Sequence, residues 1–376
     1  MKIFKLKDIS EFIRNGVTIK QDISSKEGIP ITRIETISKG TIDFNKLGYA
    51  NIFKIEKYKE WLLKKGDILI SHINSEKHLG KSAIYLDNNY DIIHGMNLLC
   101  IRVMDKKVFP EYLQLFFKTN QYKKQIKKIT KKSVNQASFS VNDFKEILIT
   151  VPDLNIQEKI IKKIKVLEKI LENNKLKLVY LSELTKSLFT RMFGDIKSND
   201  KNWKIYKFSE KLKISSGGTP SKANKIYWEN GTISWIGSNM CNDEIITKND
   251  GKFITEEGLK NSSAKIYKMN TVIVALVGAT IGKTGLLKFE TSTNQNIAAL
   301  EIKNMDYSPE FLFFLLQNLY YKFTKLGGDT FKMANLSFIK NLPLISPPIE
   351  LQNKFAERIE KIEKLKFEIE KSIAMA

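Results

Sequence analysis

Two stretches of this chain open long, lysine-rich helical repeats: VPDLNIQE at residues 151–158 and SPPIELQN at residues 346–353. They lie 195 positions apart and correspond residue for residue. Upstream, Pro110–Phe117 matches Pro309–Leu316, and Leu79–Ser82 matches Ile281–Thr284. These three pairs of matching segments, with offsets between 195 and 202, indicate a duplicated unit. We therefore expect two similar lobes that carry different loops.

The segment between the lobes repeats its seam residues at alternating spacings of four and three, which is typical of a coiled-coil helix. The seam positions are Ile160, Ile164, Leu167, Leu171, Asn174, Leu178, Leu181, Thr185 and Leu188. The C-terminal segment repeats the stripe at Phe355, Ile359, Ile362, Lys366, Ile369 and Ile373. Because both helices must bury one stripe in the same register, we expect them to pair with each other. A pseudo-twofold relation between the lobes would make that pair antiparallel.

The lobes themselves have the pattern of an α+β fold. In the first, strand-like runs at 66–71 and 98–103 precede helical periodicity from 110 to 128. In the second, strand-like runs at 271–276 and 297–302 precede a helix predicted from 309 to about 326. The predicted domains are a first lobe at 1–150, a central spacer helix at 151–200, a second lobe at 201–345 and a distal spacer helix at 346–376.

Composition favours a folded chain with a polyanionic partner. A length of 376 residues is enough for two cores, and 62 Lys and Arg against 41 Asp and Glu give a net charge of +21. Genomic drift toward lysine is the alternative source of this excess. Cys100 and Cys241 lie far apart without a paired-cysteine motif, so the sequence indicates neither a disulfide framework nor a thiolate metal site. We expect a cytoplasmic protein with no signal peptide and no membrane span.

Three segments resemble catalytic motifs but lack an essential feature of each. Gly278–Thr284 has three residues between its glycines where a phosphate-binding loop needs four. Ser346–Ile349 lacks the aromatic residue with which an amino-methyltransferase stacks on its target base, and is better interpreted as a proline stop before a helix. His72, His78 and His94 have no metal-binding spacing. The sequence therefore predicts no catalytic residue, no bound metal and no cofactor in this chain.

Residues suited to nucleic-acid contact lie near the end of each lobe. In the first, a lysine run from 123 to 132 leads into a polar loop; we predict phosphate contacts from Lys131 and Lys132 and base contacts from Asn135 and Gln136. A solvated helix face is the alternative for the lysines on the helix. In the second lobe, the equivalent loop offers Lys325, Thr330 and Lys332. Lys283 is the exposed lysine of the repeated turn.

Several of these segments resemble type I restriction-modification specificity subunits. The run Ser216–Ser221 (SGGTPS), followed by YWENG at 227–231 and ISW at 233–235, is similar to the opening of a target-recognition domain in that family. LISPPIELQ at 344–352 resembles the entry into its spacer helix. The first lobe lacks the glycine-threonine-proline-serine run around Asn15 and Gly16. The resemblance places further DNA contacts at Thr219, Ser221 and Lys222.

The resemblance also implies a division of labour. Each lobe would read one half of a split double-stranded DNA target, while two methyltransferase subunits dock on the spacer helices. S-adenosylmethionine, ATP and Mg²⁺ would be bound by those subunits and by motor-nuclease subunits, not by this chain. Helices over 156–193 and 350–373 would extend about 57 Å and about 36 Å, and one duplex turn is about 34–36 Å. Two other classes stay open: a scaffolding coiled coil, and a self-contained methyltransferase or nuclease.

Overall fold

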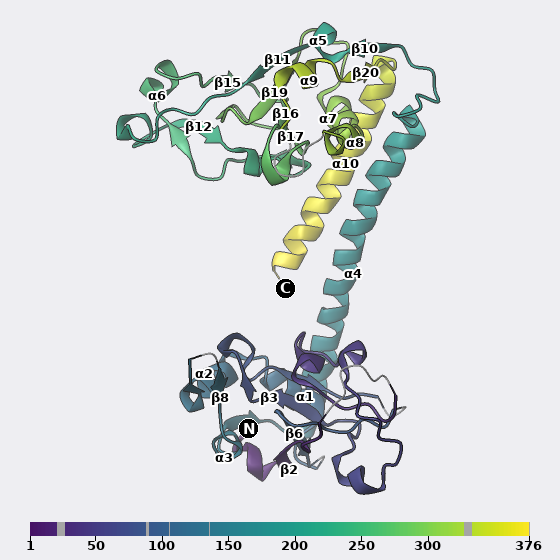
Figure 1. Ribbon diagram of the computed structural model, residues 1–376, viewed down its shortest axis with the longest axis vertical. Helices are drawn as coiled ribbons and strands as arrows, with labels where there is room; N and C mark the ends of the chain where they lie inside the picture. The colour runs from purple at the N-terminus through teal and green to yellow at the C-terminus, as the bar shows by residue number, and fades with distance from the viewer. Residues whose placement is uncertain (21–26, 88–89, 105, 135, 327–332, 376) are drawn as a thin grey trace. The chain divides into compact units, whose positions relative to one another are not determined.

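The computed structural model describes residues 1–20, 27–87, 90–104, 106–134, 136–326 and 333–375 (Figure 1). The chain divides into two compact units, Met1–Ile170 and Leu171–Ala376, and each is considered by itself. Three predicted DNA contacts, Asn135, Thr330 and Lys332, lie outside the described residues. Within the described part of the chain, every helix is too short or too polar to cross a membrane.

The first unit is a mixed α and β structure whose main sheet has the strand order β2-β6-β3-β5, antiparallel throughout. A separate antiparallel pair joins β1 to β9, and a small sheet has the order β4-β8-β7. The strands are β1 Lys2–Lys5, β2 Ser10–Asn15, β3 Ile68–Ser71, β4 Ile73–Asn74, β5 Ser82–Ile84, β6 Leu98–Val103, β7 Lys131–Lys132, β8 Ala137–Ser138 and β9 Leu148–Val151. The helices are α1 Pro110–Phe116, α2 Asn120–Ile129, α3 Val141–Lys145 and the start of α4, Leu154–Phe193.

Both faces of the main sheet in the first unit are covered. Along β6, Leu99 and Ile101 pack into one apolar cluster, which includes residues of α1, α2 and α3. Their neighbours Leu98 and Cys100 pack into a second cluster with Leu63 and other residues on the opposite face. Successive side chains of a strand point to opposite faces. Burial on both faces explains why β3 and β6 are continuous apolar runs in the sequence.

The second unit repeats this plan and adds a further sheet. Its main sheet has the order β11-β19-β16-β17-β13, β10 pairs with β20, and a third sheet has the order β14-β12-β18-β15. The strands are β10 Ile205–Lys207, β11 Leu212–Ser216, β12 Ile233–Ile236, β13 Glu244–Ile246, β14 Phe253–Ile254, β15 Ile266–Tyr267, β16 Val272–Ala275, β17 Thr284–Leu287, β18 Thr291–Thr293, β19 Ile297–Ile302 and β20 Pro343–Ile345. The helices are α5 Phe208–Lys211, α6 Glu256–Lys260, α7 Pro309–Asn318, α8 Tyr320–Thr324, α9 Leu336–Lys340 and α10 Ile349–Ala374.

The duplication seen in the sequence is confirmed as a repeat of strand order. In each unit a strand near the start of the lobe pairs antiparallel with the strand that precedes a spacer helix: β1 with β9, and β10 with β20. The order β2-β6-β3-β5 of the first unit corresponds to β11-β19-β16-β17 of the second. The two units therefore share one α+β plan.

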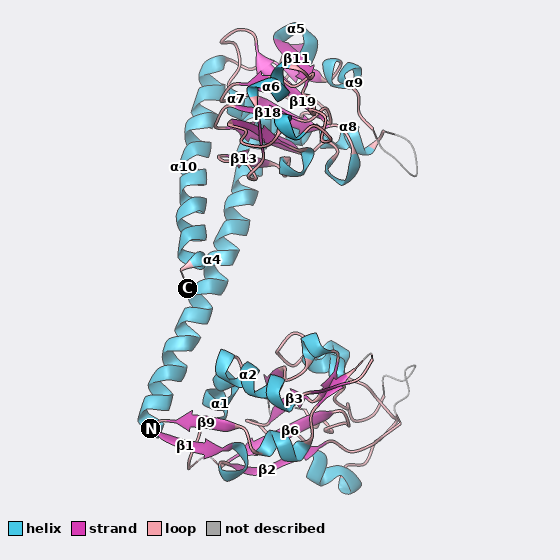
Figure 2. Ribbon diagram, turned by 90° about the vertical axis from the view of Figure 1, so that its left-hand side faces the viewer, coloured by secondary structure: helices cyan, strands magenta, loops and turns pink. Residues whose placement is uncertain are grey.

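The second half of α4 pairs with α10, as the matching registers predict, and the two helices run antiparallel (Figures 1 and 2). Phe189 and Phe193, near the end of α4, contact Phe355 in the second turn of α10 at ring-centroid distances of 5.6 and 5.3 Å. Asn174, near the middle of α4, donates a 3.3 Å hydrogen bond to Ser372 near the end of α10. Asn174 and Thr185 are buried, which confirms that these two polar residues occupy the seam.

The first half of α4 lies against the lobe of the first unit. Lys118 pairs with Glu168 at 2.9 Å, and Lys165 with Glu111 at 3.6 Å. The predicted seam residues Ile160 and Ile164 are partly buried, but Leu167 is 47% exposed. Since each residue turns the helix by about 100°, Leu167 lies on the side opposite Lys165 and faces away from these contacts.

Each predicted lobe helix is divided in two, which the periodicity did not indicate. In the first unit the break follows Phe116, because the Thr119 hydroxyl donates to the Phe116 carbonyl at 2.7 Å and accepts from the Tyr122 N–H at 3.2 Å. Thr119 thus ends α1 and caps α2. In the second unit α7 and α8 meet at Leu319.

Candidate nucleic-acid interface

The glycine pair of the second unit is required by close backbone packing. A Cβ on Gly217 would lie 2.1 Å from the Thr293 carbonyl oxygen, and one on Gly218 would lie 2.4 Å from the carbonyl carbon of Ser263. Gly218 donates to Thr293 at 2.9 Å and accepts a 3.0 Å hydrogen bond from the Trp235 indole. This packing fixes where the following residues, Thr219 to Lys222, leave the sheet.

A groove of about 690 Å³ lies beside that glycine turn. Its aromatic wall contains Trp228 and Trp235, whose rings meet edge to face at 5.2 Å. The Trp228 indole donates to the Ser221 carbonyl at 3.1 Å. The groove is lined by Lys222, Lys225, Trp228, Glu229, Trp235, Gly237, Ser238, Asn239, Gly251, Lys252, Phe253 and Asn294. Ammonium groups and amides together suit a nucleic-acid contact, since they can bind phosphates and hydrogen-bond to base edges.

Thr219 and Ser221 do not line this groove themselves, but each is bonded to a residue that lines it or directly follows one that does. The Thr219 hydroxyl donates to the Oε1 of Gln295, an exposed residue that directly follows the groove residue Asn294. The structure therefore brings together three predicted contacts, Thr219, Ser221 and Lys222, with an amide pair that the sequence did not single out.

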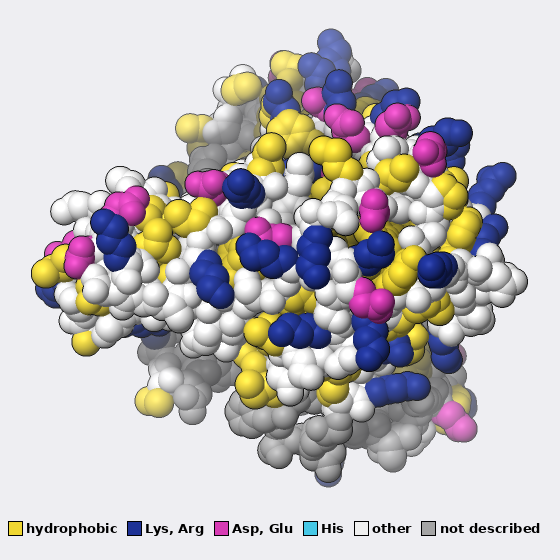
Figure 3. Space-filling model, turned by 90° about the horizontal axis from the view of Figure 1, so that it is seen from above, with side chains coloured by type: hydrophobic (Ala, Val, Ile, Leu, Met, Phe, Trp, Pro, Cys, Tyr) yellow, Lys and Arg dark blue, Asp and Glu magenta, His cyan; other side chains and the backbone are white. Residues whose placement is uncertain are grey.

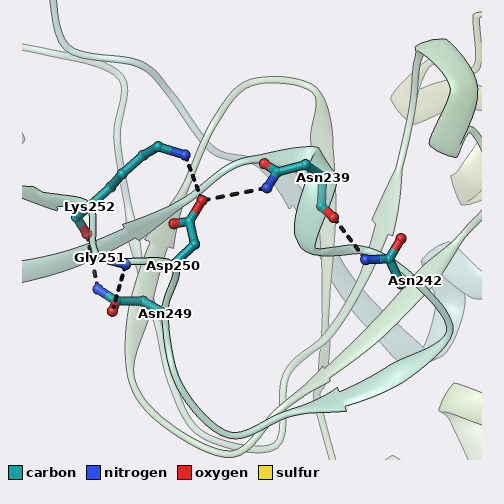
Figure 4. Close-up of polar contacts among 6 residues, drawn as sticks. All are labelled: Asn239, Asn242, Asn249, Asp250, Gly251 and Lys252. Atoms are coloured by element: carbon teal, nitrogen blue, oxygen red, sulfur yellow. Dashed lines mark hydrogen bonds and ion pairs between the residues drawn. The ribbon is translucent and has the colours of Figure 1, made fainter. Parts of the chain in front are cut away.

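The loops that contribute Asn239, Gly251 and Lys252 to the groove carry a network of polar side chains (Figure 4). The Asp250 carboxylate accepts from Lys252 at 2.5 Å and from the Asn239 amide at 3.4 Å. Asn242 donates to the Asn239 carbonyl at 2.9 Å, and Asn249 donates to the Lys252 carbonyl at 3.0 Å. These bonds hold two loops, 237–242 and 249–252, in a defined geometry at the groove.

In the first unit the predicted contacts lie on a hairpin. Lys131 and Lys132 form β7, whose partner β8 follows a turn closed by a 2.8 Å hydrogen bond from the Ser133 N–H to the Gln136 carbonyl. Val134 is 99% exposed at the turn, and the Gln136 side chain is also exposed. Lys132 forms a 2.9 Å ion pair with Glu76 on the protein surface. The two lysines therefore lie on a strand, whereas Gln136 lies in the turn before β8.

A basic groove of about 460 Å³ adjoins this hairpin. Its apolar floor is provided by Leu79, Phe117, Tyr122 and Ile126. Its rim carries Lys77, Lys81, Lys123, Lys127 and Lys132, with Glu76 as the acid among them. Clustered lysines around a concave surface attract phosphates irrespective of base sequence.

Lys283 lies apart from the groove that Lys222 lines. Its ammonium is 2.6 Å from an Asp243 carboxylate oxygen and 5.3 Å from the centroid of the Tyr320 ring. The hydrogen bond to Asp243 raises the pKa of Lys283. The residue after it, Thr284, begins strand β17, whereas the lysine of a phosphate-binding loop opens a helix. Lys325, at the end of α8, lies 6.0 Å from the Tyr321 ring centroid.

Charges in the second unit are mixed over the face drawn in Figure 3, where lysines and arginines are spread among acids without one continuous basic block. On this face the lysines and arginines therefore lie as single side chains and small groups.

Comparison with known proteins decides the family. The profile described as the type I restriction modification DNA specificity domain matches twice, at residues 1–180 and 200–375. This chain belongs to the type I specificity family. Its two matches correspond to the duplication, one for each copy.

Relatives of the specificity family match along nearly the whole chain. A Methanocaldococcus jannaschii protein assigned as the MjaX type I restriction enzyme specificity subunit is 30% identical, over 97% of this chain and 87% of that protein. The MjaIX specificity subunit of the same organism is 25% identical over 93% of this chain and 84% of its own length. The crystal structure of the S subunit of a type I restriction-modification system from M. genitalium shares the fold, with a TM-score of 0.60, 13% identity and coverage of 100% of this chain and 92% of that one.

Several residues that line the two grooves were not predicted as DNA contacts from the sequence. Lys77 lies just before the duplicated turn at Gly80, and Lys225 and Lys252 flank the tryptophan-containing segments. These three lysines could have been predicted from their nearness in the sequence to the repeated turn and to the tryptophan-containing segments. Asn239 and Asn294 gave no signal, because asparagine is frequent in loops throughout the chain and only the fold brings these two to one groove.

Proposed function

We propose that this chain is the DNA-reading subunit of a type I restriction-modification complex, with one half of a split target read by each lobe. The observation that carries the proposal is the pairing of one duplicated scaffold with two unlike surfaces. The first unit has a hairpin with Gln136 and a lysine-rimmed groove; the second has a groove with tryptophans and asparagines. Equivalent scaffolds with different side chains suit the reading of two different sequences.

Partner subunits would carry out the chemistry. Two methyltransferase subunits would dock on the spacer helices, bind S-adenosylmethionine and methylate adenine, and motor-nuclease subunits would use ATP and Mg²⁺. Within the second unit α4 exposes Val179, Tyr180 and Leu184, with 52%, 62% and 51% of their surfaces accessible. Large apolar side chains left open on a helix are common at protein interfaces. The complex would act in the cytoplasm, and this chain would itself be non-catalytic.

Adenine-methylation mapping tests this function. Cells that produce the methyltransferase subunits with and without this chain should differ by one methylated motif, made of two short sequences separated by an unspecified gap. The purified chain alone, given S-adenosylmethionine and duplex DNA, should transfer no methyl group. Methylation by the chain alone would indicate a self-contained enzyme. Identical methylation with and without the chain, together with no salt-sensitive duplex binding, would favour a scaffold instead.

A further inference from the structure

Each spacer helix begins with a completely buried glutamine. Gln157 lies in the first turn of α4 and Gln352 in the first turn of α10, and both are 0% exposed. They are 195 positions apart, so they are the same residue of the duplicated unit. Polar side chains are rarely buried to this degree unless their hydrogen-bonding groups are satisfied.

Gln157 joins three segments of the first unit. Its Oε1 accepts a 2.9 Å hydrogen bond from the N–H of Phe109, the residue that caps α1. Its Nε2 donates to the carbonyls of Lys107 at 3.1 Å and Pro152 at 2.8 Å. One amide thus connects the helix, the strand-to-helix linker at Pro152 and the loop that enters the lobe helices.

Gln352 makes the same three bonds in the second unit. Its Oε1 accepts from the N–H of Ser308 at 3.0 Å, where Ser308 caps α7. Its Nε2 donates to the carbonyls of Asp306 at 3.2 Å and Pro347 at 2.8 Å. The partners correspond to those of Gln157 in kind and sequence position, and the paired distances agree within 0.1 Å. The same three bonds in both copies indicate a shared structural role for this glutamine.

We propose that Gln157 and Gln352 are positioning residues that set the angle at which each lobe joins its spacer helix, and thereby the accuracy of the gap between the two half-sites. This inference rests on the proposed function. A glutamine amide is needed because it accepts one bond and donates two at once. Methionine of similar length would leave one N–H and two carbonyls without a partner, and a glutamate would place negative charge against two carbonyl oxygens.

The test compares binding to duplexes that carry the mapped target with its natural gap and with the gap changed by one base pair. The assembled complex is used, containing the wild-type chain, Gln157→Met or Gln352→Met. The wild type should prefer the natural gap by on the order of tenfold, comparable to the loss of one good base contact. Each variant should lose most of that preference, at least about threefold. A small change in the angle between lobe and helix is enough to displace the DNA-contacting residues of the lobe. The bases preferred within each half-site should stay the same.

Gln114→Met is the matched control. Gln114 is also a buried glutamine of the first unit, but its amide donates to the Ser82 carbonyl at 3.2 Å and joins α1 to β5 inside the lobe. It should therefore cost stability without changing the gap preference. If the methionine variants do not fold, Gln157→Asn and Gln352→Asn, which shorten the amide by one methylene, provide the same comparison.

Hydrogen exchange supplies a second readout. Gln157→Met removes the side-chain carbonyl that accepts from Phe109, so it should speed exchange at the Phe109 N–H and leave exchange at the Ser308 N–H unchanged. Gln352→Met should speed exchange at the Ser308 N–H and leave exchange at the Phe109 N–H unchanged. An unchanged gap preference in folded variants, an equal loss in Gln114→Met, or altered bases within a half-site would overturn the inference. A wild-type complex with no preference for any gap would instead overturn the proposed function.

Discussion

At the scale of single residues, the two units differ in their histidine content. All three histidines of the chain are in the first unit. Burial lowers the pKa of His94 to about 4 and that of His72 to about 4. His94 is 2% exposed, and one of its ring nitrogens lies 2.9 Å from the Leu98 carbonyl. Both rings are therefore neutral in the folded protein at neutral pH.

The first unit should lose stability as pH falls from about 6.5 to about 4, because the unfolded chain then binds protons that the folded rings do not. For His94 alone the loss is about 2 kcal/mol by pH 5. Hydrogen exchange of β3 and β6, corrected for the intrinsic pH effect, measures it, with β16 and β19 as the histidine-free comparison. His94→Gln should reduce the loss; an equal acid sensitivity in that variant would show that His94 is not its source.

The lysines of the hairpin should contribute to DNA binding without base preference. Changing Lys131 and Lys132 together to Ala should weaken binding to all duplexes similarly and reduce the salt slope by up to about 1 for each phosphate that is no longer neutralised. Titrations at several salt concentrations measure this. Lys145→Ala, in α3 of the same unit, is the control variant for a general loss of charge. An unchanged slope in the double variant would place the hairpin away from the phosphates.

Gln136 should act on one base pair. It is exposed on the closed hairpin turn, so Gln136→Ala should preserve the fold. We expect the variant to lose discrimination at a single position of one half-site, at a cost of about 1–3 kcal/mol for a bidentate contact. Binding to a library of half-site sequences measures this. A uniform loss over all sequences would assign Gln136 to the backbone instead.

At the scale of elements, an aromatic cluster anchors the helix pair of the second unit. Phe355 is 0% exposed and meets Phe189, Phe193 and Phe314 within 5.6 Å. Phe355→Ala should cost about 3–5 kcal/mol of unfolding free energy. Phe367, on the same helix and 63% exposed, is the control, and Phe367→Ala should change stability by about 0.5 kcal/mol or less. Urea unfolding of both variants measures the difference; equal losses would mean that the cluster is not the anchor.

The elements also show what the sequence could and could not predict. The spacer helices were predictable because a heptad stripe is a local, repeated signal that burial then confirms at Asn174 and Thr185. The break between α1 and α2 was not, because a single hydroxyl, that of Thr119, decides it within a stretch of good helical periodicity. Gln157 and Gln352 were visible as a repeated residue, but their role depends on carbonyls about 50 positions away.

The candidate site was predictable only in part. The glycine run at 217–218 is a local signal, because its close contacts tolerate no side chain, and it led to Thr219, Ser221 and Lys222. Lys283 was selected on the same kind of local signal, yet its ammonium is paired with Asp243, 40 positions earlier in the chain. Which asparagines line a groove depends on how several loops meet, and spacing in the sequence does not encode that.

At the scale of the whole molecule, the central claim is that the spacer helices set the distance between two independent readers. The claim draws on the family membership, on the repeated strand order and on the antiparallel pairing of α4 with α10. If it holds, the length of the helices should decide only the unspecified gap, and the lobes should decide only the bases. The two properties should then be separable by changing the helices alone.

The most direct measurement is methylation mapping of a complex whose spacer is longer by one heptad. Seven residues are inserted in α4 after Asn174 and seven in α10 after Ile369, which keeps both seams in phase. This adds about 10 Å, or roughly three base pairs. A half-site roughly three base pairs further along the duplex is rotated by about a third of a duplex turn relative to its lobe, so binding should weaken. The account predicts that both half-site sequences are kept and that the gap between them lengthens. An unchanged gap, or altered bases within a half-site, would contradict it.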